Sequence, residues 1–186
     1  MSKTDELAKA YSGLLGDQVV VKRGRKGKNV MTMAKPRSKG VPTEKQLASR
    51  ERMSLAAVYA KRAKEDPALW EMYAQRARKG LPTFRVAAND FLQLPFLRNI
   101  DTSGYFGNPG DSIRAAAGDK IGLTEVKARL QAPDGTLVEE GPCVLDLPTG
   151  IYAYVATIMV ADITGITVII TVRDIPGNVV RKSVTL

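Results

Sequence analysis

Histidine is absent from this chain of 186 residues, and cysteine occurs once, as Cys143. Without histidine the chain lacks the usual general base, the base of Ser-His-Asp and Cys-His sites, and the commonest metal ligand. A single cysteine can form neither an internal disulfide nor a zinc cluster, and Cys143 is expected to be a small buried residue rather than a nucleophile. We therefore predict a protein that is not an enzyme and that uses no cofactor or metal.

Long apolar runs are also missing, since no stretch approaches the about 20 apolar residues that a membrane-spanning helix needs. Residues 1–6 are charged and lack the apolar core of a signal peptide. We therefore expect no contact with a membrane. Synthesis in the cytoplasm is expected, followed by residence there or in a virion or other particle that is assembled inside the cell.

Acidic residues are scarce in the first hundred positions, where 21 Lys and Arg face 9 Asp and Glu, for a net charge of +12. Residues 101–186 contain 7 basic and 10 acidic residues, a net charge of −3, and the two parts sum to the +9 of the chain. A chain of this length can form two small domains. The charge division indicates two tasks, with the basic part facing a polyanion or an acidic protein surface.

The most basic stretch lies between β-prone runs at residues 19–21 and 30–33, after a weak helix signal at residues 4–15. Two such runs around a polar, glycine-containing centre are typical of a β-hairpin with a cationic tip. The candidate contacts with a polyanion or protein partner are Lys22, Arg23, Arg25, Lys26, Lys28, Lys35, Arg37 and Lys39. The alternative is a solvated loop that only aids solubility. Charge alone predicts sequence-independent, salt-sensitive binding of nucleic acid.

Helix signals follow the basic stretch. Thr43 and Gln46 have the spacing of a capping box, which predicts a helix over residues 43–65. A second helix is predicted over residues 66–79, because an Asp-Pro pair opens it and a glycine follows it, and a third over residues 83–94. The side chains expected to pack these helices together are Met53, Leu55, Ala56, Tyr59, Ala60, Ala63, Trp70, Tyr73, Phe84 and Phe91. Helical periodicity favours a core role for the aromatic members over a base-stacking platform.

Two resemblances arise in this half of the chain. Lys64-Glu65-Asp66-Pro67, followed by Leu69-Trp70, resembles part of an HMG box, which implies a minor-groove DNA-bending module. The basic hairpin, the Thr-x-x-Gln helix start and Arg50 together resemble small uncharacterised bacterial and phage-encoded proteins. The second resemblance implies no activity.

Glycine and proline recur over residues 104–110 and predict a linker over residues 99–110, between an N-terminal module at 1–98 and a C-terminal domain at 111–186. In the C-terminal domain, period-2 alternation and turn residues predict about six short strands, which indicate a small β-sandwich. The clearest strand signals lie at residues 125–130, 137–138, 151–156, 166–173 and 180–186.

The last hairpin resembles bacterial immunoglobulin-like domains, with an Asp-x-x-Gly-Asn turn at Asp174, Gly177 and Asn178. The resemblance implies an immunoglobulin-like fold and, for function, only the range of spacers, adhesins and decorations on surfaces and virions. Carboxylates scattered among the turns suit ordinary turn chemistry or, alternatively, a calcium site. They are Asp134, Glu139, Glu140, Asp162 and Asp174.

Taken together, the sequence predicts an α+β multidomain protein with a basic β-hairpin, about three helices and an immunoglobulin-like β-sandwich. The predicted function is that of a non-enzymatic structural or interaction protein in a phage or phage-like particle or another large assembly. Its partners are expected to be proteins in a homo- or hetero-oligomer. The alternative is an intracellular DNA-binding protein, nucleoid-associated or HMG-box-like, that contacts the phosphate backbone.

Overall fold

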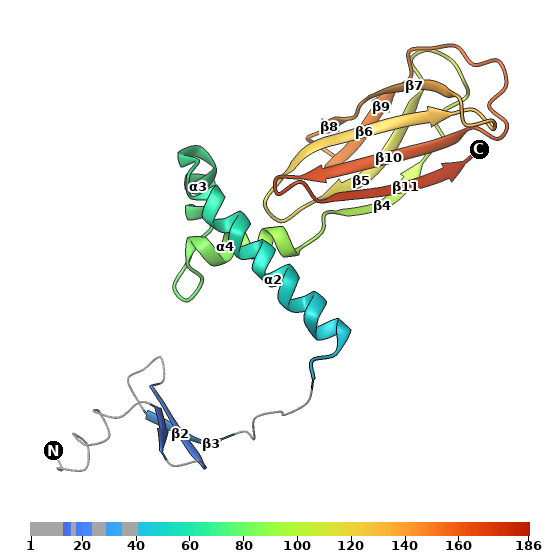
Figure 1. Cartoon of the computed structure of the whole chain (residues 1–186). Coiled ribbons are helices and arrows are strands. Elements are labelled where there is room, and N and C mark those ends of the chain that lie inside the picture. The colour runs from blue at the N-terminus through green and yellow to red at the C-terminus, as the bar shows by residue number, and fades with distance from the viewer. Residues whose placement is uncertain (1–12, 16–17, 24–28, 35–40) are drawn as a thin grey trace. The chain divides into compact units, whose positions relative to one another are not determined.

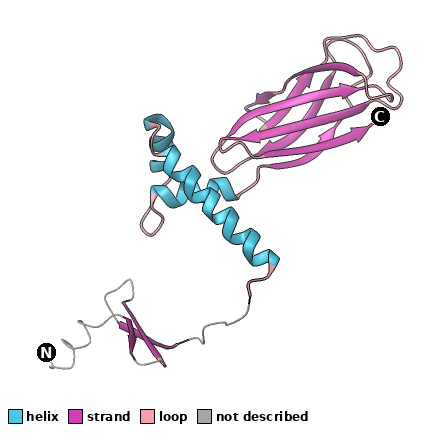
Figure 2. Ribbon diagram, in the orientation of Figure 1, coloured by secondary structure: helices cyan, strands magenta, loops and turns pink. Residues whose placement is uncertain are grey.

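The computed structural model describes residues 13–15, 18–23, 29–34 and 41–186 (Figure 1). The chain forms two compact units, Met1–Thr43 and Glu44–Leu186, and each is described by itself. Helices and antiparallel strands both occur in the described residues, so the predicted mixed α+β class is confirmed (Figure 2).

The first unit contains a three-stranded antiparallel sheet in the order β1-β2-β3, formed by Gly13–Leu15, Val19–Arg23 and Asn29–Met33. Val21 of β2 lies opposite Met31 of β3, so the predicted hairpin is confirmed. Its valines are β-branched and suit the pleated surface of a sheet. β1 pairs with β2, and the helix predicted over residues 4–15 is therefore wrong at residues 13–15. The rest of that predicted helix lies outside the described residues.

Three described helices open the second unit: α2 at Glu44–Ala63, α3 at Pro67–Ala74 and α4 at Thr83–Leu92. The predicted start of α3 is confirmed, because Asp66 Oδ1 accepts hydrogen bonds from the backbone nitrogens of Ala68 and Leu69 at 3.0 and 3.1 Å. The helix ends at Ala74, five residues before the predicted end.

Small residues hold α2 against α4. Ala56, Ala60 and Ala63 are almost fully buried, and their short side chains let the two helices approach closely. Met53 and Leu55, by contrast, are 56% and 51% exposed, so their predicted packing role is wrong. The helical core is completed by side chains from α3 and α4, namely Tyr73, Val86 and Ala87.

The remainder of the second unit, residues 96–186, is here called the two-sheet body. Its eight strands are β4 (Phe96–Asp101), β5 (Ser112–Gly118), β6 (Leu123–Gln131), β7 (Leu137–Pro142), β8 (Val144–Asp146), β9 (Ile151–Val155), β10 (Thr167–Asp174) and β11 (Val179–Thr185). They form two four-stranded antiparallel sheets in the orders β11-β10-β6-β7 and β4-β5-β9-β8 (Figure 1).

Alternation along the strands fills one core between these sheets. Val168, Ile170 and Val172 of β10 are fully buried, whereas the residues between them reach solvent, as the period of two predicts. Both sheets contribute to the same core, with Leu97, Ile113, Ala115, Val126, Ala128, Leu130 and Tyr154 among its members. Two half-buried sheets thus bury their apolar faces against each other.

The linker predicted over residues 99–110 requires correction. β4 crosses its start and pairs with β5, with Leu97 opposite Ala117 and Ile100 opposite Ala115. Tyr105 is only 2% exposed and belongs to the core of the two-sheet body. The glycines and prolines of this region form tight turns inside the body, and the division between compact units falls instead at Thr43 and Glu44.

Candidate functional site

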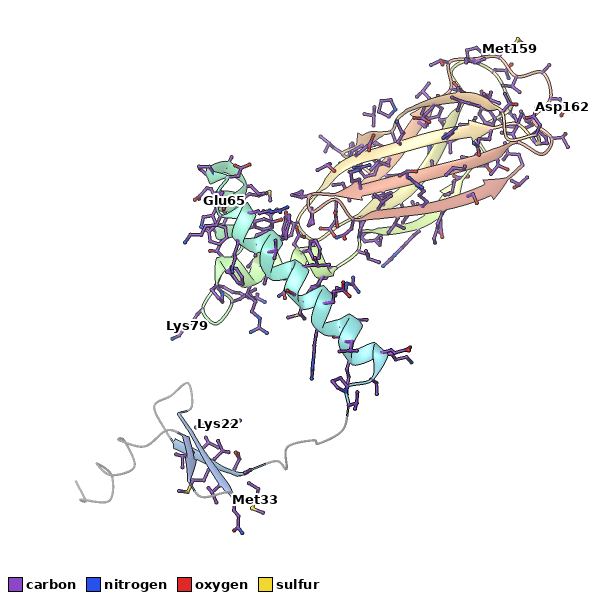
Figure 3. The ribbon with its side chains drawn as sticks, in the orientation of Figure 1. Lys22, Met33, Glu65, Lys79, Met159 and Asp162 are labelled. Atoms are coloured by element: carbon purple, nitrogen blue, oxygen red, sulfur yellow. The ribbon has the colours of Figure 1, made fainter. Side chains whose placement is uncertain are left out.

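The predicted contact residues are only partly described by the structure. Lys22 lies on β2 with an exposed side chain (Figure 3). Arg23 ends β2 and lies opposite Asn29 of β3. The other predicted contact residues lie outside the described residues: Arg25, Lys26, Lys28, Lys35, Arg37 and Lys39. A cluster that joins all eight therefore stays a prediction.

The edge strand β3 carries exposed apolar side chains. Val30, Met31 and Met33 are 49%, 69% and 81% exposed, and Met33 is labelled in Figure 3. Because successive side chains of a strand point to opposite faces, Met31 and Met33 share one face and Val30 lies on the other. β3 ends the described sheet order, and no described strand pairs with its outer edge. An exposed apolar edge of this kind can receive a further strand.

The first half of α2 is likewise uncovered. Every residue from Glu44 to Leu55 is exposed, and burial begins at Ala56. Leu47 and Met53 within this stretch are 51% and 56% exposed. A helix in water gains most of its stability from packing an apolar face, and these three turns contain no buried residue.

A buried chain of hydrogen bonds joins the three helices. The Tyr73 hydroxyl donates to Asp90 Oδ2 at 2.7 Å, and the Tyr59 and Tyr73 hydroxyl oxygens are also 2.7 Å apart. Since the Tyr73 proton points to the carboxylate, Tyr59 is the donor in the second bond. Tyr73 and Asp90 are 0% and 3% exposed, and Tyr59 is stacked on Phe91 with ring centroids 5.5 Å apart.

Burial is the main cause of the pKa shifts of Asp90 and Tyr73 in this chain of hydrogen bonds. It raises the pKa of Asp90 from 3.8 to about 6, although the hydrogen bond from Tyr73 and the charge of Arg76 act in the opposite direction. Nearby Asp119 and Asp174 raise the pKa of Asp90 further. Burial also raises the pKa of the Tyr73 phenol, and both of its hydrogen-bonding neighbours add to that shift. Tyr73 therefore stays a hydrogen-bond donor at neutral pH.

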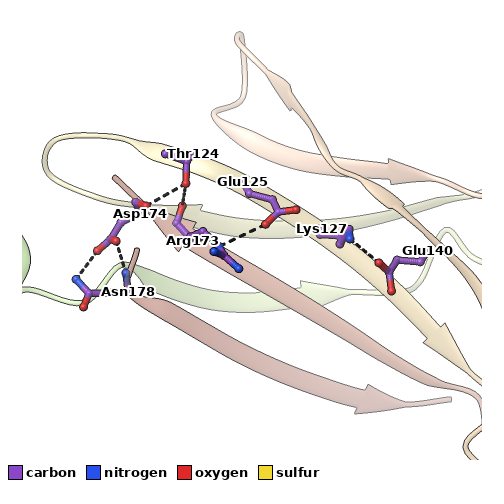
Figure 4. A network of polar contacts seen from close by, with 7 residues as sticks. All are labelled: Thr124, Glu125, Lys127, Glu140, Arg173, Asp174 and Asn178. Atoms are coloured by element: carbon purple, nitrogen blue, oxygen red, sulfur yellow. Dashed lines mark hydrogen bonds and ion pairs between the residues drawn. The ribbon is translucent and has the colours of Figure 1, made fainter. Parts of the chain in front are cut away.

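The turn between β10 and β11 fastens the two-sheet body to α4. Asn178 Nδ2 lies 2.7 Å from Asp174 Oδ2, and 3.2 and 3.1 Å from the carbonyl oxygens of Phe91 and Gln93. The backbone nitrogen of Asn178 donates to Asp174 Oδ1 at 2.6 Å (Figure 4). Gly177 has a φ of 95°, a conformation that favours glycine. The predicted Asp-x-x-Gly-Asn turn is thus confirmed, and it also caps the C-terminus of a helix.

Charged pairs line the outer face of β6 and its neighbours. Lys127 Nζ lies 2.5 Å from Glu140 Oε1, and Arg173 Nε lies 3.5 Å from Glu125 Oε2 (Figure 4). All four side chains are partly exposed, and ion pairs at such positions contribute only about 0–1 kcal/mol each. These ion pairs make the outer face of the sheet charged, but they contribute little to its stability.

The remaining carboxylates that were candidates for a calcium site serve local structure. Asp134 and Asp162 accept hydrogen bonds from the backbone two residues further on, which lowers the pKa of each. Glu139 Oε2 accepts two bonds from Thr157, one from the backbone nitrogen and one from the hydroxyl, both at 3.0 Å. Within the described ranges no three metal-ligating side chains of the Asp, Glu, Cys and His types come together.

Cys143 is buried between the sheets, as predicted. Burial raises the pKa of its thiol to about 12, so that the thiol is protonated at neutral pH. A protonated thiol is a poor nucleophile, which fits the expected role of a small core residue.

Asp90 is the functional candidate that sequence reasoning missed. A carboxylate that lies at helical spacing from Val86 and Ala87 falls on the buried face of its helix, and this was the available signal. A lone buried aspartate requires a partner, and Tyr73 could not be identified as that partner from the sequence.

Comparison with known proteins adds no family, since no family model and no curated protein matches the chain. Among the described residues, no helix is both long enough and apolar enough to cross a bilayer.

Proposed function

We propose that this protein is a non-enzymatic structural or interaction component of a large assembly, such as a phage or phage-like particle, and that it docks through its N-terminal sheet. The observation that carries the proposal is edge strand β3, whose Val30, Met31 and Met33 are exposed on both faces. The uncovered first half of α2 supports the same role.

Strand addition at β3 would satisfy edge backbone groups and cover apolar surface in one step. Complete burial of a valine or methionine side chain contributes about 1.5–3 kcal/mol. Burial of three such side chains therefore favours docking by several kcal/mol. The entropy lost on association must be subtracted from this free energy.

The charge of the N-terminal unit specifies the chemistry of the partner. Residues 1–43 contain ten Lys and Arg but only three Asp and Glu, a net charge of +7. Two copies of this unit repel each other, whereas an acidic extended segment of another subunit is attracted and steered toward it. We therefore assign to β3 an acidic partner strand.

The two-sheet body has the role of a spacer or decoration in this proposal. Two antiparallel four-stranded sheets around one core, closed by the Asp174–Asn178 turn, support the inference that it is an immunoglobulin-like domain. The fold by itself specifies no activity, because sandwiches of this kind serve many functions.

Sedimentation of the full chain after gentle lysis tests the proposal. The protein is expected to sediment with a large protein particle, with and without prior nuclease treatment, because acidic protein rather than nucleic acid holds it. The double variant Met31→Thr/Met33→Thr keeps β propensity but removes two of the three exposed apolar side chains of β3, and it is expected to shift to the slowly sedimenting fractions.

Leu137→Thr provides the matched control, since Leu137 is a 48% exposed apolar residue on β7 of the two-sheet body. This variant is expected to stay in the particle. Release of the wild type by nuclease would favour the DNA-binding alternative, and unchanged sedimentation of the double variant would exclude docking through β3.

A further inference from the structure

A cavity of about 250 Å³ lies where α4 meets the α3–α4 connection and the β5–β6 turn. Leu81, Val86 and Ile121 give it apolar walls. Its polar and charged lining consists of Arg76, Arg78, Asn89, Asp90, Gln93 and Lys120. This volume is somewhat below the roughly 300–1,000 Å³ of pockets that hold drug-sized ligands, so the cavity suits a smaller molecule.

Asp90 offers the cavity an unused acceptor. The residue is only 3% exposed, and its Oδ2 accepts the Tyr73 hydrogen bond. Oδ1 receives no hydrogen bond from any residue that the structure describes. Oδ1 is not one of the fully buried side-chain atoms without a partner, so it is accessible from the cavity that Asp90 lines. A carboxylate oxygen there can accept a hydrogen bond from a charged donor, and such bonds are about twice as strong as neutral ones.

Two of the three cationic side chains that line the cavity also have no bonding partner among the described residues. Arg76 is used structurally, since its guanidinium donates to the carbonyl oxygens of Met72 and Ile121 at 3.1 and 3.0 Å. The side chains of Arg78 and Lys120, by contrast, form no hydrogen bond or ion pair with the described residues. Both residues line the cavity and are exposed to solvent.

We propose that this cavity binds a small acidic amino acid, with its ammonium group on Asp90 Oδ1 and its two carboxylates on Arg78 and Lys120. The free groups of the site are one carboxylate oxygen and two cations, and a dicarboxylic amino acid carries the complementary set of one ammonium and two anionic groups. The site goes beyond the proposed assembly role, because it lies in the second unit and uses none of the residues of β3.

The identity of the ligand follows from matched pairs of probes. L-glutamate and L-aspartate differ from glutarate and succinate only by the ammonium group that is assigned to Asp90. In titration calorimetry of the full chain at pH 7.5, each amino acid is expected to bind at least about tenfold more tightly than its deaminated analogue, because the analogue lacks the charge-assisted hydrogen bond to Asp90.

Variants separate the two halves of the site. Asp90→Asn retains an acceptor for Tyr73, and it is expected to weaken L-glutamate about tenfold while leaving glutarate unchanged or tighter. Lys120→Ala and Arg78→Ala are expected to weaken both ligands. Lys79→Ala is the matched control, since Lys79 is an exposed cation of the same connection that does not line the cavity (Figure 3).

The absence of saturable binding by either amino acid would overturn the assignment. Equal affinity for L-glutamate and glutarate in the wild type would overturn the role of Asp90, and this comparison holds even if a variant folds poorly. Unchanged binding in both Arg78→Ala and Lys120→Ala would exclude these two residues as the groups that bind the carboxylates of the ligand. None of these results depends on whether the protein docks through β3.

Discussion

Acidification from pH 8 to pH 4.5 is expected to stabilise the wild type relative to Asp90→Asn by about 2 kcal/mol. The pKa of Asp90 is raised from 3.8 to about 6 in the folded protein, chiefly by burial. A raised carboxyl pKa means that the folded state binds the proton more tightly than the unfolded state does. Stability from this group is therefore fully present below about pH 4, and it is lost as the pH rises through about 6.

Urea unfolding of both proteins at several pH values between 4.5 and 8 measures this difference. Comparison with Asp90→Asn cancels the titration of the other carboxylates. Besides burial, the groups that set the pKa of Asp90, and with it the pH range of this change in stability, are Tyr73, Arg76, Asp119 and Asp174. A stability difference that does not vary with pH, or one that grows in favour of the wild type above pH 6, would contradict the assignment of a buried ionising aspartate.

Asn178→Ala is expected to lower the free energy of unfolding by about 2–3 kcal/mol, as a buried carboxylate loses a hydrogen-bond donor. Asn178 donates to Asp174, which is 1% exposed, and its amide also reaches the last carbonyl groups of α4. Its removal leaves Asp174 Oδ2 without this donor and loosens the connection between helix and sheets.

Thermal unfolding of the segment 44–186 provides the measurement, since this segment is a compact unit. The unmodified segment is expected to unfold in one transition, because α4 and the two-sheet body are joined by hydrogen bonds. Asn99→Ala serves as the control, since Asn99 is exposed on β4, and it is expected to change stability by no more than about 0.5 kcal/mol. Separate unfolding of helices and sheets in the unmodified segment would show that the connection contributes little.

Local signals predicted those parts of the fold that local chemistry determines. The start of α3 follows from the capping side chain of Asp66 and the fixed φ of Pro67. The inward residues of β10 follow from strict alternation of large apolar side chains. Neither inference needs knowledge of the partner element.

The sequence analysis predicted no strand at β5 or β8, and both strands lack these signals. β5 has the sequence SIRAAAG, and alanine and glycine have low β propensity, so that its place in the sheet depends on pairing with β4 and β9. β8 is only three residues long. The glycines and prolines before β5 are equally compatible with a linker and with tight turns, and the burial of Tyr105 decides for the turns.

Of the two candidate sites, the N-terminal one could be predicted from the sequence and the cavity at Asp90 could not. Charge runs made the basic N-terminal residues visible in the sequence, and the apolar character of β3 was visible as well. The cavity at Asp90 depends on residues from the α3–α4 connection, α4 and the β5–β6 turn. Two of them that are in contact, Arg76 and Ile121, are 45 positions apart in the sequence. Such convergence is set by tertiary packing rather than by any local pattern.

Hydrogen exchange at β3 tests the proposed docking most directly. Backbone amides of Asn29–Met33 are compared between dilute free protein and protein in the isolated particle, with the central amides of β10, which pair on both sides, as the internal control. Exchange at β3 is expected to slow at least about tenfold in the particle, an increase in opening free energy of about 1.4 kcal/mol, while β10 stays protected in both states. Equal exchange at β3 in both states would contradict docking through this strand.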